Sequence, residues 1–276
     1  MANISAADIK KLRDMTDAGM MDCKKALEAT DGDFEAAVDH LRKQGLKLAA
    51  KRADREATDG VVIAKVHQSR NYGIIIKVSC ETDFVAKNEN FVAFATQLAD
   101  IALNNRPENL EALLALELDG VAISERVAEQ VGRIGEKIEL AQYEHIGSSQ
   151  VAAYIHTGYK AGVLVAINQE NAEAFEAAKS IAMQVAAMKP VGLDKDDVDA
   201  TIVAREIEVA KDLARNEGKP EEMLEKIALG RLNKFYKEQT LLNQEYVRDS
   251  SKTVAQFLDS VSKGLTVKAF KHVTLG

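Results

Sequence analysis

The sequence has little of what builds disulfide-rich, metal-binding or membrane-spanning proteins. Its 276 residues include two cysteines, three prolines and no tryptophan. With only Cys23 and Cys80, and no CxxC pair, the chain lacks both a disulfide framework and a metal cage. It also lacks the run of about eighteen apolar residues that a membrane helix needs. We therefore predict a fold without disulfides, metals or membrane-spanning helices.

An excess of positive charge is also missing. The chain carries 36 Lys and Arg against 43 Asp and Glu, a net charge of -7, whereas proteins that coat nucleic acid need a basic face. Its 46% hydrophobic and 29% charged content is that of a globular chain. The start, MANISAADIKKL, lacks the apolar segment of a secretion signal. These features predict a cytoplasmic protein without direct nucleic-acid binding.

Motifs for nucleotide binding and covalent chemistry are absent too. The sequence contains neither GxxxxGK[ST] nor GxGxxG, and the glycines of GRIGEK at 132–137 have the wrong spacing. His67 and His156 are candidate metal ligands, but the pattern supplies no further ligands. Cys80 is a candidate nucleophile, although a small buried residue is the better interpretation. We predict no cofactor, no metal and no enzymatic activity.

The amino-terminal pattern is typical of short helices. Ser5 and Asp8 have the spacing of a capping box, a second helix begins near Asp22, and Asp33 can cap a third. Beyond the third helix the sequence becomes charged and poor in large apolar residues, which indicates a connecting helix and linker. We predict a three-helix domain with its linker over residues 1–55.

A change to alternating hydrophobicity marks the core. The runs 61–67 and 73–79 have the pattern of an antiparallel hairpin, and the same pattern returns at 151–156 and 162–168 with a constant offset of 89 residues. An alanine-rich helix follows each copy. A repeat of strand, strand and helix in one order indicates an internal duplication.

A third strand is repeated as well. Residues 137–146 align with 264–273 at an offset of 127, and a helix precedes each. We predict an α+β fold with two related core subdomains that have small antiparallel sheets and flanking helices. The first covers residues 56–147, and the second combines 148–190 with 247–276.

Two charged, helix-like segments separate the halves of the second subdomain. Residues 199–216 and 221–238 are joined by Gly218-Lys219-Pro220. Their apolar stripes consist of Ile202, Val209 and Leu213 in the first segment and Leu224, Ala228, Leu232 and Phe235 in the second. A narrow stripe on each helix predicts an antiparallel coiled-coil arm over residues 191–246.

Two exposed apolar features are predicted from position alone. The segment SCETDFVAKNEN is five residues longer than its counterpart in the second copy, and it carries Phe84 among polar neighbours. The ring either folds back over the core or projects as a recognition wedge, and the insertion favours the wedge. Met20 and Met21 cannot both face one small core, so we expect an exposed methionine there.

These motifs resemble bacterial elongation factor Ts over essentially the whole chain. The resemblance rests on TDAGMMDCKKALEATDGDFEAAVDHLRKQG at 16–45, DGVV at 59–62, YGIIIKVSCETDFVAKNENF at 72–91, the helical hairpin with GKP, and SSKTVAQFL at 250–258. That family is the guanine nucleotide exchange factor of the GTPase elongation factor Tu. The resemblance implies a UBA-like (ubiquitin-associated-like) first domain and a coiled-coil arm, and it implies catalysis of nucleotide release without covalent chemistry.

The resemblance also implies partner-binding residues. The segment that disturbs the magnesium and phosphate site of elongation factor Tu corresponds to Thr82, Asp83, Phe84 and Val85. The docking surface of the first domain corresponds to Leu12, Met20 and Met21, and the contact of the second subdomain corresponds to His156 and Gly158. The alternative is a UBA-type adaptor that binds proteins without exchange activity. The sequence leaves open a monomer, a homodimer and a 2:2 complex with the GTPase.

Overall fold

The computed structural model describes residues 4–16 and 18–275. Its first part is helical and consists of α1 (Ala6–Thr16), α2 (Met20–Ala29) and α3 (Phe34–Arg52). The capping box is confirmed, because the Ser5 amide donates to Asp8 Oδ2 (2.9 Å) and the Asp8 amide donates to Ser5 Oγ (3.2 Å). The Asp33 cap is also confirmed, since its carboxylate accepts from the Ala36 amide.

The second helix begins earlier than predicted. It starts at Met20 rather than near Asp22, because the Gly19 carbonyl accepts the amides of Asp22 and Cys23. The bundle closes around a small core of Leu12, Cys23, Ala26, Leu27 and Ala37. The predicted connecting helix is the second half of α3, which continues as one helix to Arg52.

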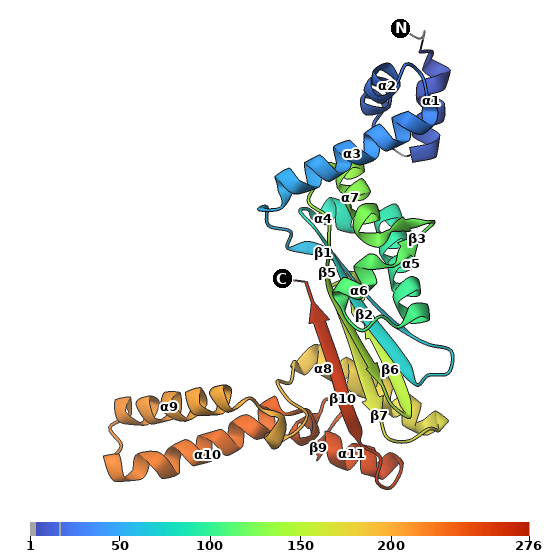
Figure 1. Ribbon diagram of the computed structural model, residues 1–276. Coiled ribbons are helices and arrows are strands. Elements are labelled where there is room, and N and C mark those ends of the chain that lie inside the picture. Colours follow the sequence, from blue (N-terminus) through green and yellow to red (C-terminus); the bar gives the residue numbers. More distant parts are fainter. Residues whose placement is uncertain (1–3, 17, 276) are drawn as a thin grey trace.

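The rest of the chain forms two units, and each contains a three-stranded sheet with helices beside it (Figure 1). The first contains β1 (Asp59–Val66), β2 (Tyr72–Cys80), α4 (Asp83–Ala86), α5 (Glu89–Asn105), α6 (Leu110–Ala115), β3 (Glu117–Leu118), β4 (Val121–Ala122), α7 (Ile123–Ile134) and β5 (Glu139–Gly147). The second contains β6 (Gln150–Ile155), β7 (Ala161–Ile167), α8 (Ala172–Met188), α9 (Ala200–Asn216), α10 (Glu221–Gln239), β8 (Glu245–Tyr246), β9 (Asp249–Thr253), α11 (Val254–Val261) and β10 (Val267–Thr274).

The predicted hairpins and third strands build two equivalent sheets. Their strand orders are β1-β2-β5 and β6-β7-β10, and every pairing is antiparallel. In the first sheet Val61 is opposite Val78 and Ile63 is opposite Ile76, so alternate residues share a face. The matching order of strands supports the internal duplication.

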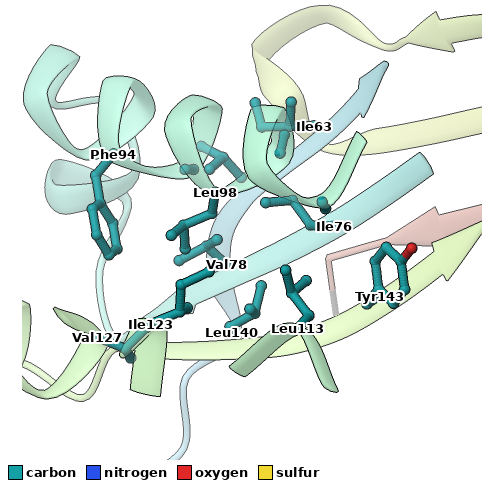
Figure 2. Close-up of a cluster of buried hydrophobic side chains, with 14 of the residues drawn as sticks. Ile63, Ile76, Val78, Phe94, Leu98, Leu113, Ile123, Val127, Leu140 and Tyr143 are labelled. Atoms are coloured by element: carbon teal, nitrogen blue, oxygen red, sulfur yellow. The ribbon is translucent and has the colours of Figure 1, made fainter. Parts of the chain in front are cut away.

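Helices cover the outer face of each sheet. In the first unit, Figure 2 shows Ile63, Ile76 and Val78 of the sheet packed with Phe94 and Leu98 of α5. In the second unit, side chains of β7 pack against α8 and α11, with Ile181 and Leu258 among the buried residues. Among the described residues, no helix has the length and apolar character needed to cross a bilayer.

The arm extends away from the sheets as an antiparallel pair of helices (Figure 1). The predicted stripe on α10 is buried at Leu224, Ala228 and Leu232. The predicted stripe on α9 is wrong by one residue, because Val209 and Leu213 are 46% and 48% exposed while their neighbours at 210 and 214 are buried. Both neighbours are alanines, and their small side chains let α10 approach closely.

Candidate partner-binding site

The segment after β2 forms a single helical turn at the edge of the first unit. Strand β2 ends at Cys80, and Thr82 caps α4 by accepting from the Val85 amide at 3.4 Å. The Cys80 thiol donates to the Thr82 carbonyl at 3.2 Å. These contacts make Asp83, Phe84 and Val85 part of a defined turn rather than an irregular loop.

Phe84 projects from this turn into solvent. Phe84 is 83% exposed, whereas Val85 is partly buried against the hydrophobic core of the first unit. The interpretation in which Phe84 folds back over the core is therefore wrong. Among the large apolar side chains that the structure describes, the next most exposed is Met21 at 62%. An aromatic ring this exposed gains little free energy from burial on folding. Exposed aromatic rings are typical of surfaces that contact another molecule.

Asp83 lies beside the ring in an exposed ion pair. Its carboxylate accepts from Lys87 Nζ at 2.6 Å, one turn further along. This hydrogen bond lowers the pKa of Asp83 and raises the pKa of Lys87. Because both groups are on the surface, the pair adds little stability and can exchange partners readily.

The carboxylates of Glu136 and Glu81 anchor the inner side of the turn, and neither role is predicted from the sequence. Glu136 accepts from the amides of Glu81 (3.1 Å) and Thr82 (3.0 Å) and from Thr82 Oγ1 (2.7 Å). Glu81 accepts from the Lys137 amide (2.6 Å) and from Arg52 Nη1 (2.8 Å). No local pattern reveals these contacts, because the partners are separated by 29 to 56 positions in the chain.

Cys80 is not an activated nucleophile. Burial, followed by the negative charges of Glu136 and Asp59, raises the pKa of its thiol to about 12. Burial likewise raises the pKa of Cys23. Since the thiolate is the reactive form, both cysteines serve as packing residues. Within residues 4–16 and 18–275, no cluster of three or more His, Cys, Asp or Glu side chains could hold a metal.

The predicted residues of the helical domain divide into exposed and buried ones. Met20 and Met21 are 44% and 62% exposed, and Met15 is exposed as well. Leu12 is fully buried in the core of the bundle. Its side chain therefore stabilises the domain, and a contact of Leu12 with a partner stays a prediction.

The predicted residues of the second unit lie in the turn between β6 and β7. His156 is exposed, and its Nδ1 is 3.1 Å from Tyr154 Oη. Gly158 has a φ of +75°, a conformation that favours glycine. This turn contacts β1, and the end of β10 lies beside it through a hydrogen bond from the Leu275 amide to the Lys160 carbonyl.

The three groups of predicted residues lie on three different parts of the molecule. Thr82 to Val85 form one turn, the methionines lie on α2, and His156 follows β6. In Figure 1, α2 lies at the outer end of the helical domain, and α4 lies beneath α3 where that domain meets the first sheet. The three groups therefore do not form one compact site.

Comparison with known proteins identifies relatives along the whole chain. The family model described as "Elongation factor TS" matches residues 81–276. Curated elongation factor Ts proteins include one from Flavobacterium psychrophilum that is 49% identical over 100% of both chains. One from Amoebophilus asiaticus is 49% identical over 99% of both chains, and one from Cytophaga hutchinsonii is 50% identical over 100% of both. With a family match over most of its length and near-half identity to these relatives, the chain belongs to the elongation factor Ts family.

Proposed function

We propose that this chain is a guanine nucleotide exchange factor of translation elongation. It binds elongation factor Tu in the GDP form and promotes GDP release by disturbing the magnesium and phosphate site, after which GTP rebinds. The observation that carries this proposal is the exposed ring of Phe84 on its capped turn, in a chain of the elongation factor Ts family. The factor performs no covalent chemistry.

In this mechanism the exchange factor and the nucleotide bind best to different states of the same GTPase. The factor binds best to the state that holds GDP and magnesium poorly, so its binding free energy lowers nucleotide affinity. Phe84 enters between partner helices as a wedge, and Asp83 leaves its ion pair with Lys87 to rearrange polar contacts near the magnesium. Each tenfold loss of nucleotide affinity requires about 1.4 kcal/mol of coupling.

The domain organisation is part of the proposal. Residues 1–55 form a UBA-like domain with its linker, residues 56–147 form one core subdomain, and residues 148–190 with 247–276 form the other. Residues 191–246 form a coiled-coil arm, which the buried seam between α9 and α10 supports. The protein acts in the cytoplasm.

The remaining predicted residues contribute affinity for the GTPase and are not part of the wedge. Met20 and Met21 dock on a helix of the nucleotide-binding domain of elongation factor Tu, and their exposure supports this role. The turn with His156 and Gly158 contacts the third domain of the GTPase, which its exposed position supports. Two copies of the chain can pair as a homodimer or in a 2:2 complex with the GTPase.

Replacement of Phe84 tests the proposal. Phe84→Ala removes the ring without touching the core, so we expect release of fluorescent GDP from elongation factor Tu to slow by about tenfold or more in stopped-flow experiments. Val247→Ala, at another exposed apolar position of the chain, should leave release unchanged. Circular dichroism should show that both variants are folded.

The exposed methionines favour the adaptor as the second candidate. An adaptor needs Met20 and Met21 but has no use for Phe84. If the natural protein does not accelerate GDP release from elongation factor Tu, while Met20→Ser with Met21→Ser abolishes binding to its partner, the chain is an adaptor and the exchange proposal is wrong.

A further inference from the structure

The turn that carries Phe84 cannot hold its own position. Helix α4 has four residues, and a helix this short is unstable without outside contacts. The Phe84 ring is too exposed to be fixed by its own packing. The orientation of the ring therefore depends on the packing of Val85 and Ala86 on the core and on the groups that hold the backbone before Phe84.

Glu136 is placed to do this. It is the second residue after α7, and the intervening Gly135 turns the chain with a φ of +80°. Its Oε2 accepts from two successive amides, those of Glu81 and Thr82, and its Oε1 accepts from the Thr82 hydroxyl. One carboxylate thus receives three hydrogen bonds from the two residues that enter α4, and hydrogen bonds to a charged acceptor are stronger than neutral ones.

Glu81 makes the reciprocal connection. Its carboxylate accepts from the Lys137 amide, so each of the segments 81–82 and 136–137 binds the other's backbone. The same carboxylate pairs with Arg52, the last residue of α3, and with Arg55 Nη1 at 2.9 Å. Lys137 Nζ in turn donates to the Ala53 and Arg55 carbonyls. These contacts join the end of the helical domain to the base of the Phe84 turn.

We propose that Glu136 is a positioning residue for Phe84, and that Glu81 extends its hold to the end of α3. This proposal rests on the exchange function proposed above. A wedge held in place before docking loses less conformational freedom when it binds, so more binding free energy remains to displace nucleotide. Glu136 itself need not contact the GTPase, because it acts through the position of the ring.

The first test needs no partner. The chain contains no tryptophan, so Phe84→Trp places a single fluorescent reporter on the turn. Glu136→Ala in this background should increase the amplitude of fast local rotation by about twofold in time-resolved anisotropy. Glu139→Ala removes a nearby carboxylate whose ion pair is with the Lys137 side chain, and it should leave the rotation unchanged. Unchanged rotation in the Glu136→Ala protein would overturn the proposal.

The second test is a double-mutant cycle on GDP release. Glu136→Ala should slow release by about fivefold when Phe84 is present and by less than about twofold in the Phe84→Ala background. Equal slowing in both backgrounds would show that Glu136 acts elsewhere and would overturn its positioning role. If Phe84→Ala alone has no effect, Phe84 is not part of the mechanism, and a natural protein that does not accelerate GDP release would defeat the exchange proposal. In both cases the anisotropy experiment still decides whether Glu136 holds the turn.

Conservative variants separate positioning from folding. Glu136→Gln keeps one oxygen for the two amides and offers an N–H to the Thr82 hydroxyl, so it should restore most of the release rate. If Glu136→Ala reduces thermal stability, Thr82→Val provides a milder change, which removes the hydroxyl contact with Glu136 and the cap on the Val85 amide but leaves both backbone amide contacts of Glu136 in place. Like Glu136→Ala, it should increase rotation of the reporter and slow GDP release, but by smaller factors. A Glu136→Gln protein as slow as Glu136→Ala would contradict the hydrogen-bonding role.

Discussion

At the scale of single residues, the Phe84 turn combines an exposed ring with a well-connected base. The ring is open to solvent, whereas the side chain of Glu81 behind it is 18% exposed. The turn is thus anchored on its inner side and open on its outer side, which is the arrangement that the proposed wedge requires.

The anchoring of Glu81 predicts a pH dependence of stability. The hydrogen bond from the Lys137 amide, together with those from Arg55 and Arg52, lowers the pKa of Glu81 from 4.5 to about 2. A lowered pKa in the folded state stabilises the protein fully above pH 4.5, and this contribution is lost as the pH falls towards 2.

Comparison with Glu81→Gln isolates this effect. The free energy of unfolding of the natural protein should exceed that of the variant at pH 7, and the difference should shrink as the pH is lowered through the acid range. Urea unfolding at pH values on both sides of 4.5 measures it. A difference that stays constant with pH would mean that the charge of Glu81 is not what stabilises this junction.

At the scale of elements, two helices attach the helical domain to the core. Helix α3 crosses α7 at two glycines, where a Cβ on Gly132 would lie 2.8 Å from the Gly45 Cα and a Cβ on Gly45 would lie 3.0 Å from the Ala128 carbonyl oxygen. An ion pair between Arg42 and Glu129 (2.9 Å) lies beside this crossing. Glycines are needed here because the two backbones meet with no room for side chains.

Replacement by alanine should have opposite effects at a glycine of this crossing and at an exposed glycine of the arm. Gly132→Ala should lower the free energy of unfolding by about 1–3 kcal/mol, because the added methyl group meets backbone that cannot rotate away. Gly230→Ala, in the exposed middle of α10 with open space around its Cβ, should raise it by about 0.5–1 kcal/mol through helix propensity. Chemical denaturation measures both, and stabilisation by Gly132→Ala would contradict the close crossing.

At the scale of the whole molecule, the two sheets pack face to face with their helices outside. The shared core contains matched pairs from the two copies, Val62 with Val151, Ile75 with Leu164, and Ile146 with Val273. The repeated glycines lie at the closest approach of the sheets. A Cβ on Gly73 would lie 2.9 Å from Leu164 Cδ2, and a Cβ on Gly162 would lie 2.8 Å from Val62 Cγ1. The duplication thus produces a nearly symmetric joint between the halves.

The joint predicts coupling between residues of the two copies. Gly162→Ala should destabilise the protein by about 1–3 kcal/mol, because its methyl group overlaps Val62 across the joint. Val62→Ala removes the overlapping methyl groups, so the double variant should be more stable than the sum of the two single effects predicts. Thermal and urea unfolding of the four proteins measure this. Strict additivity would contradict direct packing between these two positions.

Much of this architecture could be predicted from the sequence, because it depends on local patterns. The capping residues Ser5 and Asp33, the alternating strands around Ile63 and Ile76, and the duplicated hairpins are short-range signals that correspond to observed elements. The exposure of Phe84 was also inferable, since its five-residue insertion has no counterpart in the other copy. Helix α6 and the short pairs β3–β4 and β8–β9 were not anticipated, because such brief segments carry little periodic signal.

By itself, therefore, the sequence determined the order and kind of the main elements, the duplication and the position of the inserted turn. Only the tertiary structure decided which face each helix buries, as the one-residue shift of the α9 seam and the burial of Leu12 show. It alone brought Glu136 and Arg52 to the base of the Phe84 turn. The physical reason is that periodicity acts over one or two helical turns, whereas packing and charge pairing depend on segments that approach each other only after folding.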